Sequence, residues 1–327
     1  MAKILITPRS LTKDGDPSLE LLQHAGYELV ICTPGKSPDE SELLRLVPGC
    51  VGWLAGVEKI TDAVLAKATE LRAISRNGTG VDSIDLAACQ RRGIAVLRAD
   101  GANARGVAEL TLALVLSLLR SVPESDARIK AGAWERRQGV ELEGRTLGVI
   151  GTGRIGKLVA GFALALGMKV LGCDAFPDAA WSPSPSFRYV PLPEALASSD
   201  IVTLHCPHTP GEKPLIDRQA LARMRKGAYL VNTARAGLVD DAAVLESLEE
   251  GRLSGYAVDA YDKEPPDPSP LLSHKRVIAT PHVGAYTAES VSRATRAAVE
   301  NLLAALAKEG AAKEGVAKAG AAKAGGK

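Results

Sequence analysis

Arg235, Glu264 and His282 each follow, within a few residues, a short apolar run in the last third of this 327-residue chain. Each run is typical of a β-strand, and ligands in open α/β sheets bind beyond the carboxyl ends of the strands. Successive strands would therefore bring a guanidinium, a carboxylate and an imidazole to one crevice. Histidine suits proton transfer near neutral pH, an adjacent glutamate would favour the protonated imidazole and orient it, and arginine offers two parallel donors to a carboxylate.

A glycine-rich turn lies upstream of these residues. Gly151, Gly153 and Gly156 follow the apolar run 147–150 and open a helical pattern that continues to residue 166. The first glycine permits a tight turn, the second lets backbone amides approach a pyrophosphate, and the third lets the helix pack close to its strand. The first turn of such a helix offers free N–H donors and the positive end of its dipole to a phosphate.

The residues after this turn complete the pattern of a dinucleotide-binding unit. A second apolar run spans 168–173, and Asp174 follows it, eighteen residues after Gly156. A carboxylate about 20 residues downstream of the glycines binds the ribose hydroxyls of the adenosine. A structural glycine turn in an ordinary α/β domain is the alternative, but strand, helix, strand and acid in this order favour dinucleotide binding.

Length and periodicity predict two α/β units. A chain of 327 residues exceeds the size at which a single core usually keeps growing. Short apolar runs alternate with helical patterns before and after the glycine turn, which predicts parallel sheets with right-handed crossovers. The predicted fold class is therefore α/β, with two doubly wound parallel-sheet lobes of the Rossmann and flavodoxin-like kinds and an active-site cleft between them.

Two helical patterns set the expected domain boundaries. One runs from about 103 to 119 and joins the two units. The other runs from 288 to about 306 after the last strand, and its apolar face needs a partner, which we expect to be the first unit. We therefore predict a substrate domain of residues 1–100 plus 286–306 and a dinucleotide-binding domain of residues 101–285.

The end of the chain, residues 307–327, differs in composition from the rest. It repeats alanine, lysine and glycine, with two glutamates and nothing larger than Val316 to bury, which predicts a disordered tail. The whole chain has a formal charge of +2, and the tail supplies more positive charge than that. The remaining body is close to neutral and has no general signature of a nucleic-acid partner.

The spacing of the cysteines and the hydropathy of the chain predict its cellular compartment. The five cysteines are scattered and never in CxxC spacing, which disfavours a disulfide framework and a thiolate metal site and fits a reducing cytoplasm. No metal is expected. No apolar run has the length of a membrane span, and the N-terminus does not read as a signal peptide, so no membrane partner is expected.

The run 76–85, Arg-Asn-Gly-Thr-Gly-Val-Asp-Ser-Ile-Asp, adds a further motif. Together with the glycine turn and the segments around Arg235, Glu264 and His282, it resembles the D-isomer-specific 2-hydroxyacid dehydrogenase family, in its phosphoglycerate-dehydrogenase-like branch. The resemblance spans about residues 3–306. It implies hydride transfer between NAD and a small D-2-hydroxyacid or its 2-oxoacid, and it implies a homodimer.

The resemblance assigns substrate roles to matching positions. Arg235 would bind the carboxylate and the keto oxygen of the substrate. His282 would be the acid–base group and Glu264 its partner. The backbone of residues 77–78, Asn77 and Gly78, would hold the substrate carboxylate as well, and Arg76 is a candidate contact for a second anionic group.

Cofactor roles follow from the same resemblance. Arg154 and Ile155 would contact the pyrophosphate, Asp174 the ribose, and Asp259 the carboxamide of the nicotinamide. The full set of implied cofactor positions is Thr79, Gly151, Gly153, Arg154, Ile155, Gly156, Asp174, Cys206, Thr233, Ala234, Asp259, His282 and Gly284.

Several departures from the family pattern concern the substrate. Ala236 replaces the usual glycine after the arginine, His208 stands where leucine is common, and Tyr261-Asp262 replaces Phe-Glu. The segment 54–57 has no arginine where phosphoglycerate enzymes place one for the phosphate. The substrate is left open among 3-phosphoglycerate, hydroxypyruvate, glyoxylate and other small acids.

Two other functions share this fold. An NAD(H)-sensing scaffold similar to the C-terminal-binding-protein corepressors is the alternative, because those proteins retain the same three residues; the chain has no peptide-docking extension at its N-terminus. Formate oxidation is disfavoured, because the formate enzymes have glutamine where this chain has Glu264.

Overall fold

A computed structural model of the chain describes residues 1–209 and 211–324, with side chains up to residue 307. Residues 325–327, the last part of the predicted tail, lie outside that description. Helices and parallel strands alternate along the chain, as the apolar runs predict. The predicted α/β class with two parallel sheets is confirmed.

The chain divides into two compact units. Unit 1 comprises residues 1–103 and the chain from 288 onward, and unit 2 comprises residues 104–287. These limits lie within three residues of the boundaries at 100 and 286 that the sequence predicts.

Unit 1 is built on a five-stranded parallel sheet in the order β2-β1-β3-β4-β5. This is the flavodoxin-like order, in which the strand order reverses at β1 and β3, and such a switch point is where ligands bind in these folds. The strands are β1 (Ala2–Ile6), β2 (Tyr27–Ile31), β3 (Cys50–Ala55), β4 (Ala73–Arg76) and β5 (Ala95–Arg98), and the helices are α1 (Arg9–Asp14), α2 (Leu19–His24), α3 (Glu40–Leu46), α4 (Asp62–Lys67), α5 (Leu86–Arg91) and α12 (Ala288–Ala324).

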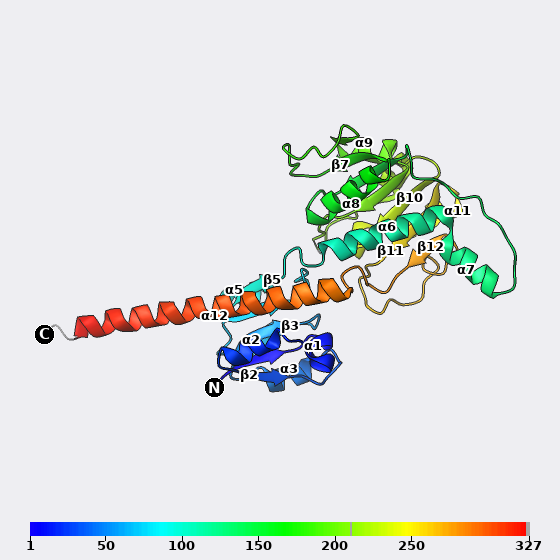
Figure 1. Ribbon diagram of the computed structural model, residues 1–327. Coiled ribbons are helices and arrows are strands. Elements are labelled where there is room, and N and C mark those ends of the chain that lie inside the picture. The colour runs from blue at the N-terminus through cyan, green and yellow to red at the C-terminus, as the bar shows by residue number, and fades with distance from the viewer. Residues whose placement is uncertain (210, 325–327) are drawn as a thin grey trace. The chain divides into compact units, whose positions relative to one another are not determined.

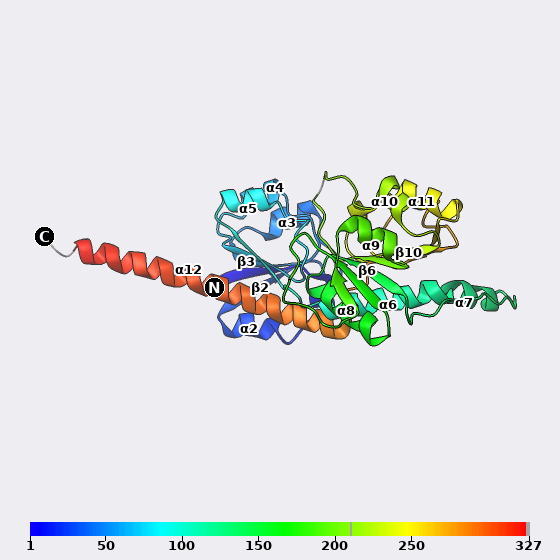
Figure 2. The same ribbon diagram turned by 90° about the horizontal axis from the view of Figure 1, so that it is seen from above.

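Helices cover both faces of this sheet. Figure 2 shows α3, α4 and α5 on one face and α2 and α12 on the other. The central strand β3 is buried at every position, as expected for a parallel strand between two helical layers. Asp39, Thr61 and Asp85 begin α3, α4 and α5 by accepting a hydrogen bond from the backbone amide three residues later.

The last helix, α12, completes the core of unit 1. Ala298, Val299 and Leu302 are fully buried in the same cluster as Ile4 of β1. Gly52 in β3 makes this close packing possible, because a Cβ atom there would lie 3.1 Å from a methyl carbon of Leu306. The expectation that this helix needs the first unit as its partner agrees with these contacts (Figure 1).

The helix α12 continues to Ala324, whereas the sequence predicts a disordered tail from residue 307. Alanine has the highest helix propensity, and elongating a helix that is already anchored avoids the cost of a new nucleus. These two effects oppose the cost of the glycines at 310, 315 and 320.

Unit 2 contains a seven-stranded parallel sheet in the order β12-β11-β10-β9-β6-β7-β8. Counted from β6, this is the order of a dinucleotide-binding sheet, with the switch point between β6 and β9. The strands are β6 (Thr146–Ile150), β7 (Lys169–Cys173), β8 (Phe187–Tyr189), β9 (Ile201–Leu204), β10 (Ala228–Asn232), β11 (Leu253–Val258) and β12 (Val277–Ala279), and the helices are α6 (Ala104–Arg120), α7 (Val122–Lys130), α8 (Arg154–Ala165), α9 (Leu192–Ser198), α10 (Arg218–Arg223), the 3₁₀ helix η1 (Ala236–Leu238) and α11 (Asp241–Glu249).

Two helical layers enclose this sheet as well. The helices α9, α10 and α11 pack on one face and α6 and α8 on the other. The predicted joining helix is α6, whose Leu114, Val115 and Leu118 are buried against the sheet. The second face therefore depends on a helix that begins where unit 1 ends.

In the residues that the structure describes, no single helix has the length and apolar character needed to cross a membrane. The bent pair α6 and α7 meets that test only when the two helices are taken together, by length and composition. Half of the residues in α6 are buried in the core of unit 2.

Deleting residues 308–327 should leave the thermal midpoint within about 2 °C of the full chain, because this segment has almost nothing apolar to bury. Differential scanning fluorimetry of the two proteins measures the shift. Leu302→Ala, in the buried part of the same helix, is the contrasting variant and should lower the free energy of unfolding by about 2–5 kcal/mol. A drop of several degrees on deletion would show that the tail stabilises the fold.

Candidate functional site

The glycine turn joins β6 to α8 at the switch point of the unit 2 sheet. Gly151 has a φ of +91°, and a Cβ atom there would lie 2.6 Å from the backbone of His205 and Cys206. A Cβ atom on Gly156 would overlap the carbonyl oxygen of Gly151, whereas one on Gly153 would meet nothing within 4 Å. The first and third glycines are therefore required by packing, and the second leaves an open approach to the backbone.

The N-terminus of α8 faces this open approach. Gly153 is its N-cap residue and, as a glycine, has no side chain to cap the first turn. That turn begins with Arg154 and Ile155. The N–H donors of this turn, with the positive end of the helix dipole, suit a pyrophosphate. The geometry of the turn thus fits a dinucleotide.

Asp174 follows β7 and lies beside the same turn. One oxygen of its carboxylate accepts hydrogen bonds from the Thr152 amide at 2.6 Å and the Thr152 hydroxyl at 3.0 Å, and the other accepts from the Phe176 amide at 2.9 Å. Partial burial alone would raise the pKa of Asp174, but these hydrogen bonds outweigh it and lower the pKa below its usual value. The carboxylate is therefore held in place and ionised.

Arg235 lies at the end of β10 in a loop fixed by a buried asparagine. The side chain of Asn232 donates to the Arg235 carbonyl at 2.8 Å and accepts from the Ala234 amide at 3.1 Å. The Arg235 guanidinium donates from Nη1 to the Ala234 carbonyl at 2.8 Å. Thr233 is anchored by a hydroxyl–hydroxyl bond of 2.9 Å to Thr111 of α6.

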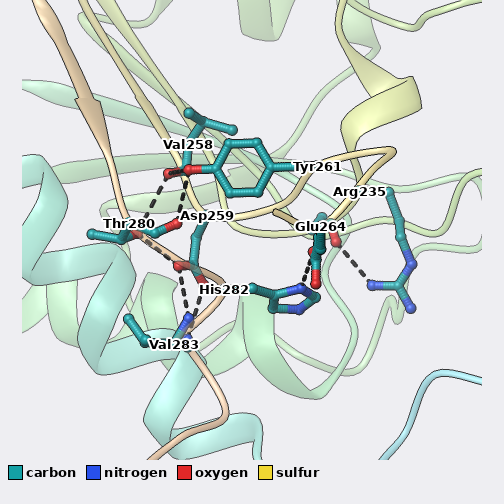
Figure 3. A network of polar contacts seen from close by, with 10 residues as sticks. Arg235, Val258, Asp259, Tyr261, Glu264, Thr280, His282 and Val283 are labelled. Atoms are coloured by element: carbon teal, nitrogen blue, oxygen red, sulfur yellow. Dashed lines mark hydrogen bonds and ion pairs between the residues drawn. The ribbon is translucent and has the colours of Figure 1, made fainter. Parts of the chain in front are cut away.

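The loop after β12 is organised by Asp259, which directly follows β11 and is 2% exposed. Its carboxylate accepts from the Thr280 hydroxyl at 2.6 Å, the Val283 amide at 2.9 Å and the Gly284 amide at 2.8 Å (Figure 3). His282 lies inside this loop with a φ of +52°, a left-handed conformation that costs a non-glycine residue about 1–2 kcal/mol. The three bonds to Asp259 hold the backbone in that conformation.

His282 and Glu264 form the closest contact of the site. The Nδ1 atom of His282 lies 2.5 Å from Oε1 of Glu264, and their side chains are 49% and 46% exposed. Since Nδ1 is bonded to the carboxylate, Nε2 is the ring nitrogen left for a ligand. Figure 3 shows the Arg235 guanidinium near this pair. The carboxyl ends of the strands thus carry a hydrogen-bonded imidazole and carboxylate together with a guanidinium.

In unit 1 the strand β4 ends at Arg76, and residues 77–79 follow it. Gly78 has a φ of +147°, and a Cβ atom there would lie 2.9 Å from Nη1 of Arg76. The Arg76 side chain folds back so that Nη1 donates to the Asn77 carbonyl, and Thr79 accepts a long bond of 3.4 Å from Asn103. Burial lowers the pKa of Arg76, while the negative charges of Glu58 and Asp82 act in the opposite direction.

The sequence-predicted residues of unit 2 come from the carboxyl ends of its strands and from the glycine turn. Three polar residues of the site are not predicted from the sequence, namely Asn232, Thr280 and Thr152. The first two directly follow an apolar run, which is the signal that could have found them. Sequence reasoning also missed His205, whose two ring nitrogens are buried without a hydrogen-bond partner in the described residues. Burial lowers the pKa of His205 to about 3, so its ring is neutral beside the glycine turn.

Residues 112–284 match the family model described as D-isomer specific 2-hydroxyacid dehydrogenase, NAD binding domain. The chain is 38% identical over 305 residues to a D-3-phosphoglycerate dehydrogenase of Methanocaldococcus jannaschii and 37% identical over 277 residues to that of Homo sapiens. These alignments cover 92% and 84% of this chain but 57% and 51% of the relatives. The chain therefore spans about half the length of the curated relatives it matches.

Solved structures resemble nearly the whole chain. The TT0316 protein of Thermus thermophilus is 37% identical with a TM-score of 0.84, and the match covers 94% of this chain and 97% of that one. A D-lactate dehydrogenase of Aquifex aeolicus, solved with NAD and lactic acid, is 28% identical with a TM-score of 0.79, over 94% of this chain and 96% of that one.

Asp259→Asn should lower the free energy of unfolding by about 2–4 kcal/mol, because an amide cannot accept all three hydrogen bonds and each bond to a charged group contributes about 1.5–3 kcal/mol. Urea titration followed by circular dichroism measures the loss. Asp267→Asn removes an exposed carboxylate paired only with Lys263 and should leave the midpoint close to wild type. Equal midpoints for the two variants would contradict the role given to Asp259.

Proposed function

This chain belongs to the D-isomer specific 2-hydroxyacid dehydrogenase family, and on that premise we propose that it transfers a hydride between NAD and a small D-2-hydroxyacid or its 2-oxoacid. The observation that carries the proposal is the hydrogen bond between His282 and Glu264, on the sheet whose switch point holds the glycine turn. Candidate substrates are 3-phosphoglycerate, hydroxypyruvate and glyoxylate.

The residues of unit 2 fit NAD, which when bound supplies or accepts a hydride at its nicotinamide ring. The amides at Gly153, Arg154 and Ile155 are proposed to hold the pyrophosphate, and Asp174 the ribose hydroxyls. Asp259 accepts three hydrogen bonds, and a carboxylate has about four acceptor positions. One position is therefore left for the carboxamide of the nicotinamide.

His282 supplies the proton in this proposal. During reduction its Nε2 atom donates a proton to the carbonyl oxygen of the substrate, and during oxidation it removes the proton from the hydroxyl. Glu264 stabilises the charged imidazole and fixes the ring through Nδ1. Arg235 donates from Nη1 to the Ala234 carbonyl, which orients the guanidinium, and the guanidinium is proposed to bind the substrate carboxylate.

The cellular location that we propose follows from the cysteine side chains. All five cysteines are free thiols, and burial raises the pKa of Cys32, Cys50 and Cys89 to about 11. These thiols are unreactive and need no disulfide partner, which supports a reducing, cytoplasmic location.

The chain should prefer NAD over NADP by at least tenfold in kcat/KM, because the Asp174 carboxylate matches two ribose hydroxyls and repels a 2′-phosphate. Rates with NADH and NADPH on one 2-oxoacid give the ratio. Asp174→Ser removes the charge and should reduce the preference. Equal kcat/KM values for the two cofactors in the wild type would refute the assignment.

His282→Ala should lower kcat for reduction by roughly 10²- to 10⁴-fold, which is the usual contribution of a placed general acid, and leave NADH binding nearly unchanged. Steady-state rates and NADH fluorescence titration measure the two quantities. His24→Ala, at an exposed histidine of unit 1, is the control and should behave as wild type. A His282→Ala enzyme of near-normal kcat would remove the histidine from the mechanism.

Glu264→Gln separates orientation from charge. The amide can keep a hydrogen bond to Nδ1 but cannot stabilise a positive ring, so kcat for reduction should fall while the KM for NADH stays close to that of the wild type. Steady-state rates of both proteins test this, and an unchanged kcat would take Glu264 out of the partner role.

The proposed homodimer uses the arm 122–137, made of α7 and the segment after it. Not one residue of α7 is buried, and Val122, Ile129 and Trp134 are 52%, 56% and 83% exposed. The arm carries both signs of charge, among them Glu124, Arg128 and Arg137. These charges pair with one another within the arm, so the exposed Val122, Ile129 and Trp134 are what a second copy is proposed to cover.

Sedimentation velocity should give the mass of a dimer for the wild type. Trp134→Glu, which places a charge in the apolar part of the arm, should shift the protein toward monomer. Phe176→Glu, at a 91% exposed residue outside the arm, should not. A wild-type monomer, or a dimer that survives Trp134→Glu unchanged, would contradict this interface.

A further inference from the structure

His208 lies in the segment that follows β9 and is partly buried. Its imidazole ring lies against the backbone of Gly237, because a Cβ atom on that glycine would overlap Cε1 of the ring and lie 2.5 Å from Nδ1. Gly237 does not have a positive φ, so its backbone conformation alone would permit a side chain. The ring of His208 is therefore what requires a glycine at this position.

The ring is held in place by its own segment. Its Nε2 atom donates a hydrogen bond of 3.3 Å to the carbonyl of Glu212, and the Glu212 amide donates to the Thr209 carbonyl at 3.0 Å. A carbonyl oxygen only accepts, so Nε2 carries the proton, and the ring cannot turn without losing this bond. The ring thus presents a fixed contact surface to Gly237.

Gly237 is the middle residue of η1, which begins directly after Arg235. The amide of Leu238 donates to the Arg235 carbonyl at 3.3 Å, and the Leu238 carbonyl accepts from the Ile216 amide at 2.9 Å. The side chain of Asn232 donates to the same Arg235 carbonyl from the preceding strand. The backbone that carries the guanidinium is therefore tied to its neighbours before and after η1, and the imidazole ring contacts the turn between these ties.

Two departures from the family pattern meet at this turn. The family commonly has leucine where this chain has His208 and glycine where it has Ala236. Ala236 begins η1, and His208 lies against the second residue of η1. A leucine has no polar atom with which to bond the Glu212 carbonyl. A contact surface fixed by a hydrogen bond is therefore a feature of this chain and not of the family pattern.

An arginine that binds a carboxylate with two donors depends on accurate placement, because both donors have to meet an oxygen at once. A displacement of about 1 Å in such a group can lower a rate about 100-fold. We propose that His208 is a positioning residue for Arg235, whose ring fixes the turn η1 and through it the guanidinium. The inference rests on the proposed function, in which Arg235 binds the carboxylate of the substrate.

The test fills the contact from one side and removes it from the other. The substrate is whichever of hydroxypyruvate, glyoxylate and 3-phosphohydroxypyruvate the wild type reduces fastest with NADH. Gly237→Ala sets a methyl group against the ring and should lower kcat/KM about 10- to 100-fold, mainly through a higher KM. His208→Ala removes the ring and should lower kcat/KM about 3- to 10-fold, again through KM.

The double variant decides whether the two residues act through one contact. Its methyl group enters the space that the ring has left, so Gly237→Ala should cost less than about threefold in kcat/KM when His208→Ala is already present. The same cost of Gly237→Ala in both backgrounds would overturn the inference, because it would show that the two residues act independently.

NADH fluorescence titration separates positioning from loss of folded protein. Thr233 is anchored by Thr111 and not by η1, so the Kd for NADH should stay close to the wild-type value in all three variants. A lower kcat with an unchanged KM in both single variants would show only loss of folded protein, and it would overturn the role of His208 while the proposed function stands. Gly161→Ala is the control, at a glycine of α8 where a Cβ atom would meet nothing within 4 Å, and it should behave as wild type. Inactivity of the wild type on all three acids would overturn the proposed function and this inference with it.

Discussion

The carboxylate of Asp259, buried at the end of β11, accepts hydrogen bonds from Thr280, Val283 and Gly284. These bonds bend the chain after β12 so that His282 takes up a left-handed backbone conformation, which a histidine adopts only when its surroundings impose it. The same bend brings its Nδ1 atom to Glu264. A single buried carboxylate thus determines where the His282 ring lies, and the contact of Nδ1 with Glu264 leaves Nε2 as the other ring nitrogen.

The glycine turn imposes a second constraint on the same unit. Gly151 and Gly156 are fixed by contacts that leave no room for a Cβ atom, whereas Gly153 faces open space. The strand order places this turn at the switch point between β6 and β9, so the position proposed for the cofactor follows from topology. The residues at the ends of β10, β11 and β12 follow in order along one side of that point. The glycine turn and the residues proposed for acid–base chemistry therefore belong to one sheet.

The sequence predicts the two parallel sheets, the joining helix and the residues that end the strands, because each has a strong local signal in period or spacing. It does not predict β8 (Phe187–Tyr189), a three-residue edge strand after a segment rich in proline and serine. It treats Arg76 as free to meet an anion, whereas the folded side chain turns back on Asn77. Asn232 escapes it too, because its bonds to the Arg235 carbonyl and the Ala234 amide form only in the folded loop and burial has no signature in residue type.

The central claim is that Arg235 holds the carboxylate common to all 2-oxoacids while His282 protonates the carbonyl. Arg235→Lys tests it most directly, because lysine keeps the charge but cannot offer two parallel donors. The measurement is NADH oxidation by wild type and variant with a panel of 2-oxoacids and the corresponding aldehydes, which lack the carboxylate. The account predicts wild-type turnover of 2-oxoacids well above that of the aldehydes, and a loss in the variant of about 10- to 10⁴-fold in kcat/KM for every active 2-oxoacid. Near-wild-type activity of the variant on an active 2-oxoacid would contradict it.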